Sequence, residues 1–131
     1  MYASVSASDG FDAAARRRIS NVVMMGMGET LMNFEPVMDA VSLMMDDWAF
    51  GLSKRKVTIS TSGVVPAIRR MKEYTDASLA VSLHAPNDDL RSSIMPINKK
   101  YPIADLIDAV KEYMAGLQDK RVPVIEYTVI K

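Results

Sequence analysis

Short apolar runs alternate along this chain with segments in which apolar residues recur every three or four positions. The apolar runs cover residues 19–25, 57–60, 78–83 and 122–130, and the last is interrupted early by Pro123. Their length and their content of valine and isoleucine predict four strands, and the continuity of residues 19–25 predicts a strand buried on both faces. This alternation restricts the possible folds more than any other feature of the sequence.

The segments between the runs predict helices. Asn33 can cap the first helix, which carries Pro36 in its first turn, and residues 64–74 predict a second helix with Pro66 near its start. The first helix presents one apolar stripe, made of Val37, Ala40, Val41, Met44, Met45 and Trp48. Such a stripe is typical of a helix that packs against a sheet.

Two further helical segments follow the third run. Residues 87–89 resemble the cap of a short helical turn that ends by Pro96. The clearest helix begins at Pro102 and ends near Gly116. Its apolar face consists of Ile103, Leu106, Ile107, Val110, Met114 and Leu117.

The order strand-helix-strand-helix-strand-turn-helix-strand predicts an α/β fold with a parallel sheet and right-handed crossovers. The chain has 131 residues, which suffice for one domain with a core. Residues 1–18 show no clear periodicity, so we expect an irregular N-terminal segment there. Residues 19–131 are expected to form the domain.

Composition excludes several classes of function. The chain has no cysteine and one histidine, which rules out disulfides, thiol catalysis, iron–sulfur ligation by its own thiolates and histidine-cluster metal sites. Its 16 Lys and Arg balance its 16 Asp and Glu, so a generally basic nucleic-acid binder is not indicated, although local patches remain possible. No signal peptide or membrane span is visible, and a cytoplasmic location is expected.

Ligands of parallel α/β folds bind where the strands end, and three predicted strand ends carry polar groups here. The first leads into Gly26-Met27-Gly28-Glu29, the second into Ser60-Thr61-Ser62-Gly63, and the third into Ser82-Leu83-His84. Glycines permit close approach to the backbone, a carboxylate suits an ammonium, and a serine can donate to a carboxylate. Together these groups match a zwitterionic amino acid, while tight turns and helix caps remain the structural alternative for each motif alone.

Hydrolytic catalysis is not expected, because no pair of nucleophile and base is evident.

Four ordered blocks, "NVVMMGMGETLMN", "GLSKRKVTISTSGVVPAI", "AVSLHAPNDDLRSSIMPINKKYPI" and "IEYTVI", closely resemble the RlmN family. This family consists of radical S-adenosylmethionine (SAM) enzymes that methylate C2 of an adenine in 23S rRNA and in some tRNAs. The resemblance covers about residues 19–131. It implies part of an open, TIM-like (β/α) barrel, with SAM bound by Gly28, Glu29, Ser60, Ser82, Leu83 and His84.

The sequence departs from the family pattern in two respects. Thr30 stands where the family usually has proline. The family's CxxxCxxC motif, which holds a [4Fe–4S] cluster, and the family's two further cysteines are absent from this sequence. The family also has a SAM-binding asparagine on a later strand, which would lie beyond residue 131. The chain therefore resembles an interior piece of the enzyme, which we expect to be inactive alone.

Two alternatives remain open at this point. The Cfr-type enzymes, which methylate C8 of the same adenine, share "GMGE" and "MPIN..YPI", whereas "STSGVVPAI" and "SLHAPND" favour the C2 family. A non-catalytic α/β binding module that lacks the cluster is the alternative from a different class.

The resemblance also implies 23S rRNA and tRNA as partners. Residues 53–56 and 98–100 are basic segments that could contact RNA phosphates, or simply form solvated loops. No membrane partner is expected. An incomplete barrel would expose sheet edges, so we expect the isolated piece to self-associate or to be only marginally stable.

Overall fold

The computed structural model describes residues 19–129, so the predicted irregular segment 1–18 lies outside the described residues. Within this range, the strands are β1 (Val22–Met24), β2 (Val57–Thr61), β3 (Ser78–Ser82) and β4 (Val124–Glu126). The α-helices are α1 (Phe34–Met45), α2 (Val65–Met71), α3 (Asp88–Ile94) and α4 (Ile103–Ala115), and two 3₁₀ helices are η1 (Thr30–Asn33) and η2 (Pro96–Lys99).

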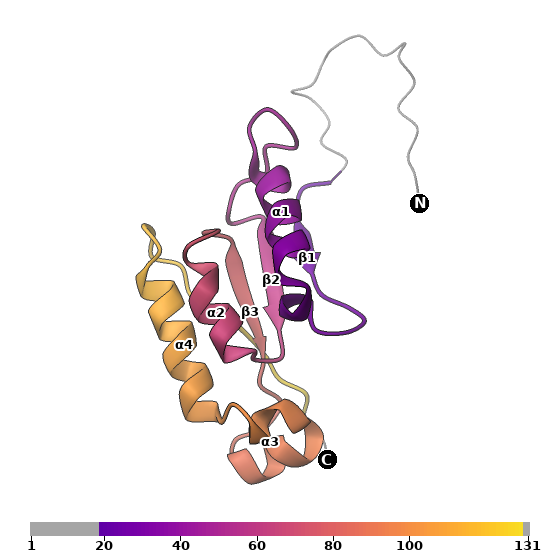
Figure 1. Ribbon diagram of the computed structural model, residues 1–131, viewed down its shortest axis with the longest axis vertical. Helices are drawn as coiled ribbons and strands as arrows, with labels where there is room; N and C mark the ends of the chain where they lie inside the picture. Colours follow the sequence, from indigo (N-terminus) through magenta and orange to yellow (C-terminus); the bar gives the residue numbers. More distant parts are fainter. Residues whose placement is uncertain (1–18, 130–131) are drawn as a thin grey trace.

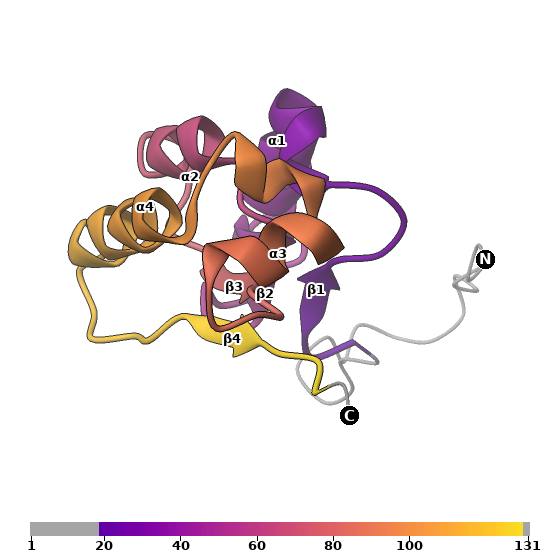
Figure 2. The same cartoon turned by 90° about the horizontal axis from the view of Figure 1, so that it is seen from below.

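The four strands form one parallel sheet in the order β1-β2-β3-β4, which confirms the predicted parallel α/β fold. Because each strand lies beside its predecessor, right-handed crossovers place all the connecting helices on the same face. Figures 1 and 2 show α1, α2 and α4 together on one side of the strands. This sequential winding is that of a segment of a (β/α) barrel.

The core lies between the helices and one face of the sheet. Val57 and Ile59 of β2 and Leu79 and Val81 of β3 are at most 1% exposed. They pack in one cluster with fully buried helical residues, namely Val41, Ile68, Leu106 and Tyr113. Each such apolar side chain contributes roughly 1.5–3 kcal/mol when it is buried, so this layer is the main source of stability.

Among the described residues, the opposite face of the sheet is open along its two outer strands, whereas Ser60 in its middle is only 7% exposed. Since side chains alternate along a strand, this face carries Ser60, Ser82 and Glu126. Val23 lies on it and is 48% exposed, and Met25 beyond β1 is 59% exposed. The prediction that residues 19–25 are buried on both faces is therefore wrong: β1 is an edge strand, and no described element covers its open face.

The helix predictions are confirmed in outline, with two errors. Asn33 directly precedes α1, but it is the last residue of η1 and its side chain makes no capping hydrogen bond. Asn87 caps α3, since its side chain accepts a hydrogen bond from the Leu90 N–H. Trp48 does not extend the apolar stripe of α1, because it is fully exposed beyond the end of the helix. The carboxylate of Asp46 accepts a hydrogen bond from the Trp48 N–H at 2.7 Å. The chain therefore forms a turn at Asp46 instead of continuing the helix.

The last strand is shorter than predicted. The pattern indicated residues 122–130, whereas β4 covers only Val124–Glu126, and Ile130 lies outside the described residues. Pro123 has no N–H that could donate to a neighbouring strand, so the strand begins after it. Val122, which precedes Pro123, is 84% exposed.

Among the helices of residues 19–129, none has the length and apolar character needed to cross a bilayer.

Candidate cofactor-binding site

The turn after β1 depends on two glycines. Gly26 and Gly28 adopt φ values of 139° and 86°, which residues with a side chain rarely adopt. A Cβ atom at either glycine would meet no other atom within 4 Å. The glycines are therefore required by the backbone conformation rather than by crowding, and the space beside them is open.

Thr30, at the position where the family usually has proline, also shapes this turn. Its hydroxyl donates to the carbonyl oxygen of Met24 at 3.1 Å. This bond connects the beginning of η1 to the end of β1, so a hydrogen bond restrains the turn in the absence of a proline ring.

The Glu29 carboxylate fastens the turn to the end of β2. Oε1 accepts hydrogen bonds from the Leu31 N–H at 3.0 Å and from the Thr61 hydroxyl at 2.6 Å. Oε2 accepts from both the N–H and the hydroxyl of Ser62. Four donors match the roughly four acceptor positions of a carboxylate, so this group is saturated by the protein itself. Its predicted contact with a ligand ammonium stays a prediction.

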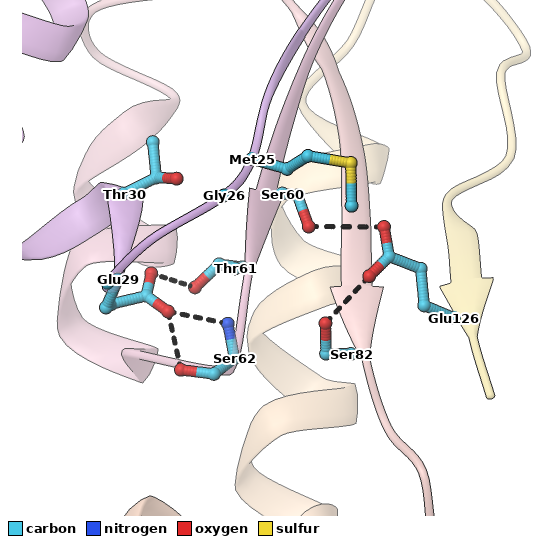
Figure 3. Close-up of a pocket in the computed structure, with 10 residues that line it drawn as sticks. Met25, Gly26, Glu29, Thr30, Ser60, Thr61, Ser62, Ser82 and Glu126 are labelled. Carbon is cyan, nitrogen blue, oxygen red and sulfur yellow. Dashed lines mark hydrogen bonds between the residues drawn. The ribbon is translucent and has the colours of Figure 1, made fainter. Parts of the chain in front are cut away.

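A second carboxylate, which sequence reasoning missed, lies on the open face of the sheet (Figure 3). Glu126 of β4 accepts hydrogen bonds from the Ser60 hydroxyl at 3.2 Å and from the Ser82 hydroxyl at 2.8 Å. Ser82 and Glu126 are register partners. The "IEYTVI" block and the alternation within the last strand were the signals that could have placed this glutamate beside the two serines.

These groups line one open cavity of about 190 Å³ at the carboxyl ends of the strands. Its walls include the predicted Gly28, Glu29, Ser60 and Ser82 together with Glu126. A neighbouring hollow of about 310 Å³ also borders the glycine turn and extends to α1. The structure thus brings four of the predicted site residues to one place, on three different strand ends.

Leu83 and His84 do not line this cavity. The Leu83 N–H donates to the backbone oxygen of Glu126 at 3.0 Å. His84 adopts a φ of 58°, and its Nδ1 accepts a hydrogen bond from the Thr128 N–H at 3.1 Å. Leu83 therefore connects the end of β3 to β4, and His84 connects it to the segment after β4. Their predicted contact with a cofactor remains a prediction.

Behind the cavity lies Arg91, a second residue that sequence reasoning missed. Its side chain is fully buried and donates to the carbonyl oxygens of Ser62, Ser82 and Leu83. Burial lowers the pKa of the guanidinium, while the nearby Asp88 raises it. The pKa of Asp88 itself is lowered, first by the Ile103 N–H and then by the Asn98 amide, both of which donate to it.

The donor set of the site fits an organic cofactor and does not fit a cluster. No group of three or more His, Cys, Asp or Glu side chains within residues 19–129 could hold a metal ion. The whole sequence lacks cysteine, so it offers no thiolate to a [4Fe–4S] cluster. Hydroxyls, carboxylates and open glycine backbone around a cavity instead suit a polar small molecule such as SAM.

Residues 8–125 match the family model described as the Radical SAM superfamily. The chain belongs to this superfamily. The match begins inside the segment 1–18, and the predicted boundary after residue 18 stays a prediction. The fold agrees with this membership. A parallel sheet with helices on one face is the architecture of part of an open (β/α) barrel, as expected for the superfamily.

Comparison with individual proteins shows which members of the superfamily the chain resembles. The chain is 64% identical over 115 residues to the dual-specificity RNA methyltransferase RlmN of Marinobacter nauticus, covering 88% of this chain and 31% of the relative. It is 58% identical over 130 residues to the protein of the same name from a Marinomonas species, covering 99% and 35%. These matches confirm the resemblance to the RlmN family.

A solved structure agrees with this assignment. The crystal structure of a radical SAM methyltransferase from Sphaerobacter thermophilus matches with a TM-score of 0.74 and 46% identity, over 82% of this chain and 31% of that chain. The radical SAM chain described here thus spans about a third of the length of the relatives that it matches.

Proposed function

We propose that this chain is the SAM-binding portion of a radical SAM methyltransferase that acts on C2 of an adenine in 23S rRNA and in some tRNAs. One observation supports the proposal most: the glycine turn, two serines and a carboxylate from four strands line one cavity. The names of the relatives supply the reaction, since they are RNA methyltransferases.

In this proposal, the residues of the cavity bind and orient SAM. The backbone of Gly26–Gly28 is open to the methionine end of SAM, and the saturated Glu29 carboxylate holds that turn in place. Ser60, Ser82 and Glu126 offer hydroxyl and carboxylate contacts further along the sheet. Neighbouring strands are about 4.8 Å apart, so the span from β1 to β4, roughly 14 Å, suits an extended ligand.

SAM supplies a methyl group and, in this family, a 5′-deoxyadenosyl radical. The [4Fe–4S] cluster on which that radical depends requires cysteines that the 131-residue sequence does not contain. We therefore assign to these residues only the binding and orientation of SAM, which lower the entropic part of the barrier. No redox step is assigned to them, and the fragment alone is expected to be inactive.

RNA contact is proposed for Lys99 and Lys100 rather than for residues 53–56. Lys54 and Arg55 pair with Asp76 and Asp119 at 2.9 and 3.2 Å, and they precede β2, at the end of the sheet opposite the cavity. Lys99 and Lys100 are exposed and follow α3, whose Arg91 contacts the strand ends beside the cavity. We therefore propose that RNA approaches the cavity from the side of these two lysines.

Two alternatives give different outcomes. A Cfr-type enzyme would methylate C8 of the adenine, whereas a non-catalytic module would bind SAM without methyl transfer. The relatives are named RlmN, which favours C2. A role in modifying ribosomal and transfer RNA also implies a cytoplasmic location for the whole protein.

A chimaera tests the proposal. The matching segment of the Marinobacter nauticus relative is replaced by this chain, its cluster is reconstituted, and methylation of a 23S rRNA fragment is followed by mass spectrometry. We expect methylation at C2, reduced at least tenfold by Ser82→Ala and unchanged by Ser93→Ala, an exposed serine on α3. A folded, cluster-loaded chimaera that neither binds SAM nor methylates RNA would contradict the proposal.

A further inference from the structure

Arg91 is a fully buried cation whose hydrogen-bond partners include no carboxylate. Its guanidinium donates to the carbonyl oxygens of Ser62 at 2.6 Å, Ser82 at 2.9 Å and Leu83 at 3.1 Å, and to the side-chain oxygen of Asn98 at 2.9 Å. Burial of a charge is costly unless hydrogen bonds compensate for it. The planar fork of an arginine makes these four bonds at once, which a lysine ammonium cannot do in the same geometry.

The three backbone acceptors mark the ends of two neighbouring strands. β3 ends at Ser82, and Ser62 follows directly after β2. At these points the parallel ladder stops, so carbonyl groups lose their partners from neighbouring strands. Arg91 supplies donors to both strand ends and thereby fixes the spacing between the segments that carry Ser60 and Ser82, the two serines that contact Glu126.

Gly63 lies directly beside the guanidinium. A Cβ atom at this position would lie 3.5 Å from Nη2 of Arg91 and 3.2 Å from both terminal methyl carbons of Leu106. Gly63 also adopts a φ of 114°, which strains any residue with a side chain. The backbone after β2 is thus held in a conformation that requires glycine, in contact with Arg91 and close to Leu106.

The same arginine joins the strand ends to the segment after α3. Asn98 of η2 accepts from Arg91 and donates to Asp88 and Ser92 of α3. This network connects α3 and η2 to the two strand ends beside the cavity, with Arg91 as the shared donor.

From these contacts we infer that Arg91 is a positioning residue for the cofactor: it sets the relative placement of the ends of β2 and β3, and therefore the geometry in which Ser60, Ser82 and Glu126 meet SAM. The inference rests on the proposed function. It assigns to Arg91 no contact with the cofactor itself.

Arg121 provides a matched control at the other end of the same strands. Its guanidinium donates to the carbonyl oxygens of Lys54, which precedes β2, and of Asp76, which precedes β3. It also pairs with Asp119 at 2.7 Å. Arg91 and Arg121 therefore join the same pair of strands, but only Arg91 does so beside the cavity.

The test compares Arg91→Lys with Arg121→Lys in the chimaera, at a temperature well below the melting temperature of both variants. S-adenosylhomocysteine, which binds without reaction, is titrated calorimetrically. We expect both variants to melt earlier, but only Arg91→Lys to raise the Kd, by about tenfold or more, since small displacements of binding groups are costly. Hydrogen exchange of residues 62–63 and 82–84 should also accelerate in Arg91→Lys only.

The outcomes separate the inference from the proposed function. If the parent chimaera does not bind S-adenosylhomocysteine, the proposed function and this inference both fail. If it binds, and the Kd of Arg91→Lys equals that of Arg121→Lys, only the inference is overturned. Asn98→Ala, which removes one partner and keeps the arginine, provides a milder variant if Arg91→Lys does not fold, and an unchanged Kd in it would overturn the inference equally.

Discussion

At the scale of single residues, the two carboxylates of the cavity differ in how many donors they meet. Glu29 accepts four hydrogen bonds from Leu31, Thr61 and Ser62, whereas Glu126 accepts two, from the hydroxyls of two serines. A saturated carboxylate holds the fold together, while one with spare acceptor positions can meet a ligand. The difference predicts separate effects of substitution.

Glu29→Gln should chiefly lower the stability of the folded chain, and Glu126→Gln should chiefly lower its affinity for S-adenosylhomocysteine. The amide nitrogen introduced at position 29 would face donors of Ser62 or Thr61, and a mismatched buried hydrogen bond costs about 1–3 kcal/mol. The amide introduced at position 126 can rotate to keep one serine bond, but the negative charge toward the ligand is removed. Thermal melts and titration with S-adenosylhomocysteine check both effects, and the reverse pattern would show that the two roles are exchanged.

Gly63 gives a second prediction at this scale. Gly63→Ala should destabilise the chain by more than about 1 kcal/mol, because alanine is strained at a φ of 114° and its methyl group meets Leu106. Denaturant unfolding measures this change. Gly116→Ala, at the end of α4, is the matched control, because Gly116 has an ordinary φ of −75° and a Cβ atom there would come no closer than 3.4 Å to its neighbours. Equal losses in the two variants would refute the strain.

At the scale of elements, the sequence patterns specify which segments are strands and helices but not what surrounds them. The cap at Asn87 depends on local chemistry and is found as predicted. Of the predicted apolar face of α4, only Leu106 and Val110 are buried, and Ala109 and Tyr113 complete the buried face. The exposure of Val23 depends on which strands flank β1, information that lies outside its own residues. Trp48 was misplaced because a local Asp46 turn competes successfully with helical periodicity.

Tyr113 shows how α4 is fastened to the sheet. Its side chain is fully buried, and its hydroxyl donates to the carbonyl oxygen of Ala77 at 2.6 Å, directly before β3. Burial is the main cause that raises the pKa of the Tyr113 phenol above its ordinary value. A raised pKa means that the folded state holds the proton more tightly than the unfolded state does.

The pH dependence of Tyr113→Phe follows from this shift. The phenol's contribution is fully present below the unfolded pKa of about 10 and is lost as the pH rises beyond it. At neutral pH the variant should be less stable by about 1 kcal/mol, because the Ala77 oxygen loses its partner. Above pH 10 the difference between wild type and variant should shrink and then reverse. Denaturant titrations from pH 7 to 12 measure the free energy of unfolding of both proteins. A difference between them that stays constant with pH would refute the raised pKa of the Tyr113 phenol.

At the scale of the whole molecule, the open face and the two edge strands dominate the behaviour of the isolated chain. Val124 of β4 is 54% exposed, and Val23 of β1 lies on the same open face. Unpaired edges with apolar side chains favour association. We expect sedimentation velocity to show concentration-dependent self-association that Val124→Lys reduces and Ala115→Lys, on α4, does not. A monomer that melts sharply at low concentration would contradict this prediction.

The positions of the lysines predict how the chimaera depends on salt when it binds RNA. Lys99→Ala with Lys100→Ala should weaken binding and reduce the slope of log K against log salt by about one for each phosphate that the protein no longer neutralises. Lys54→Ala with Arg55→Ala is the matched control, because those side chains already pair with Asp76 and Asp119. A larger decrease of affinity in the control pair would place the RNA at the opposite end of the sheet.

The candidate site was predictable from the sequence only in part. Gly28, Glu29, Ser60 and Ser82 follow from the rule that parallel strands end on one rim, and they do line one cavity. Glu126 and Arg91 were missed since their relevance depends on register and on contacts between distant segments. Whether a carboxylate is saturated, as Glu29 is, depends on three-dimensional contacts as well.

The measurement that tests the central claim most directly is a titration of the ¹⁵N-labelled chain with S-adenosylhomocysteine, followed by amide chemical shifts. The claim predicts the largest shifts at Gly26–Glu29, Ser60–Gly63 and Glu126, the residues around the cavity, with little change near Arg121 at the opposite end of the strands. Shifts that gather away from the strand ends, or none at millimolar ligand, would contradict the proposed cofactor site.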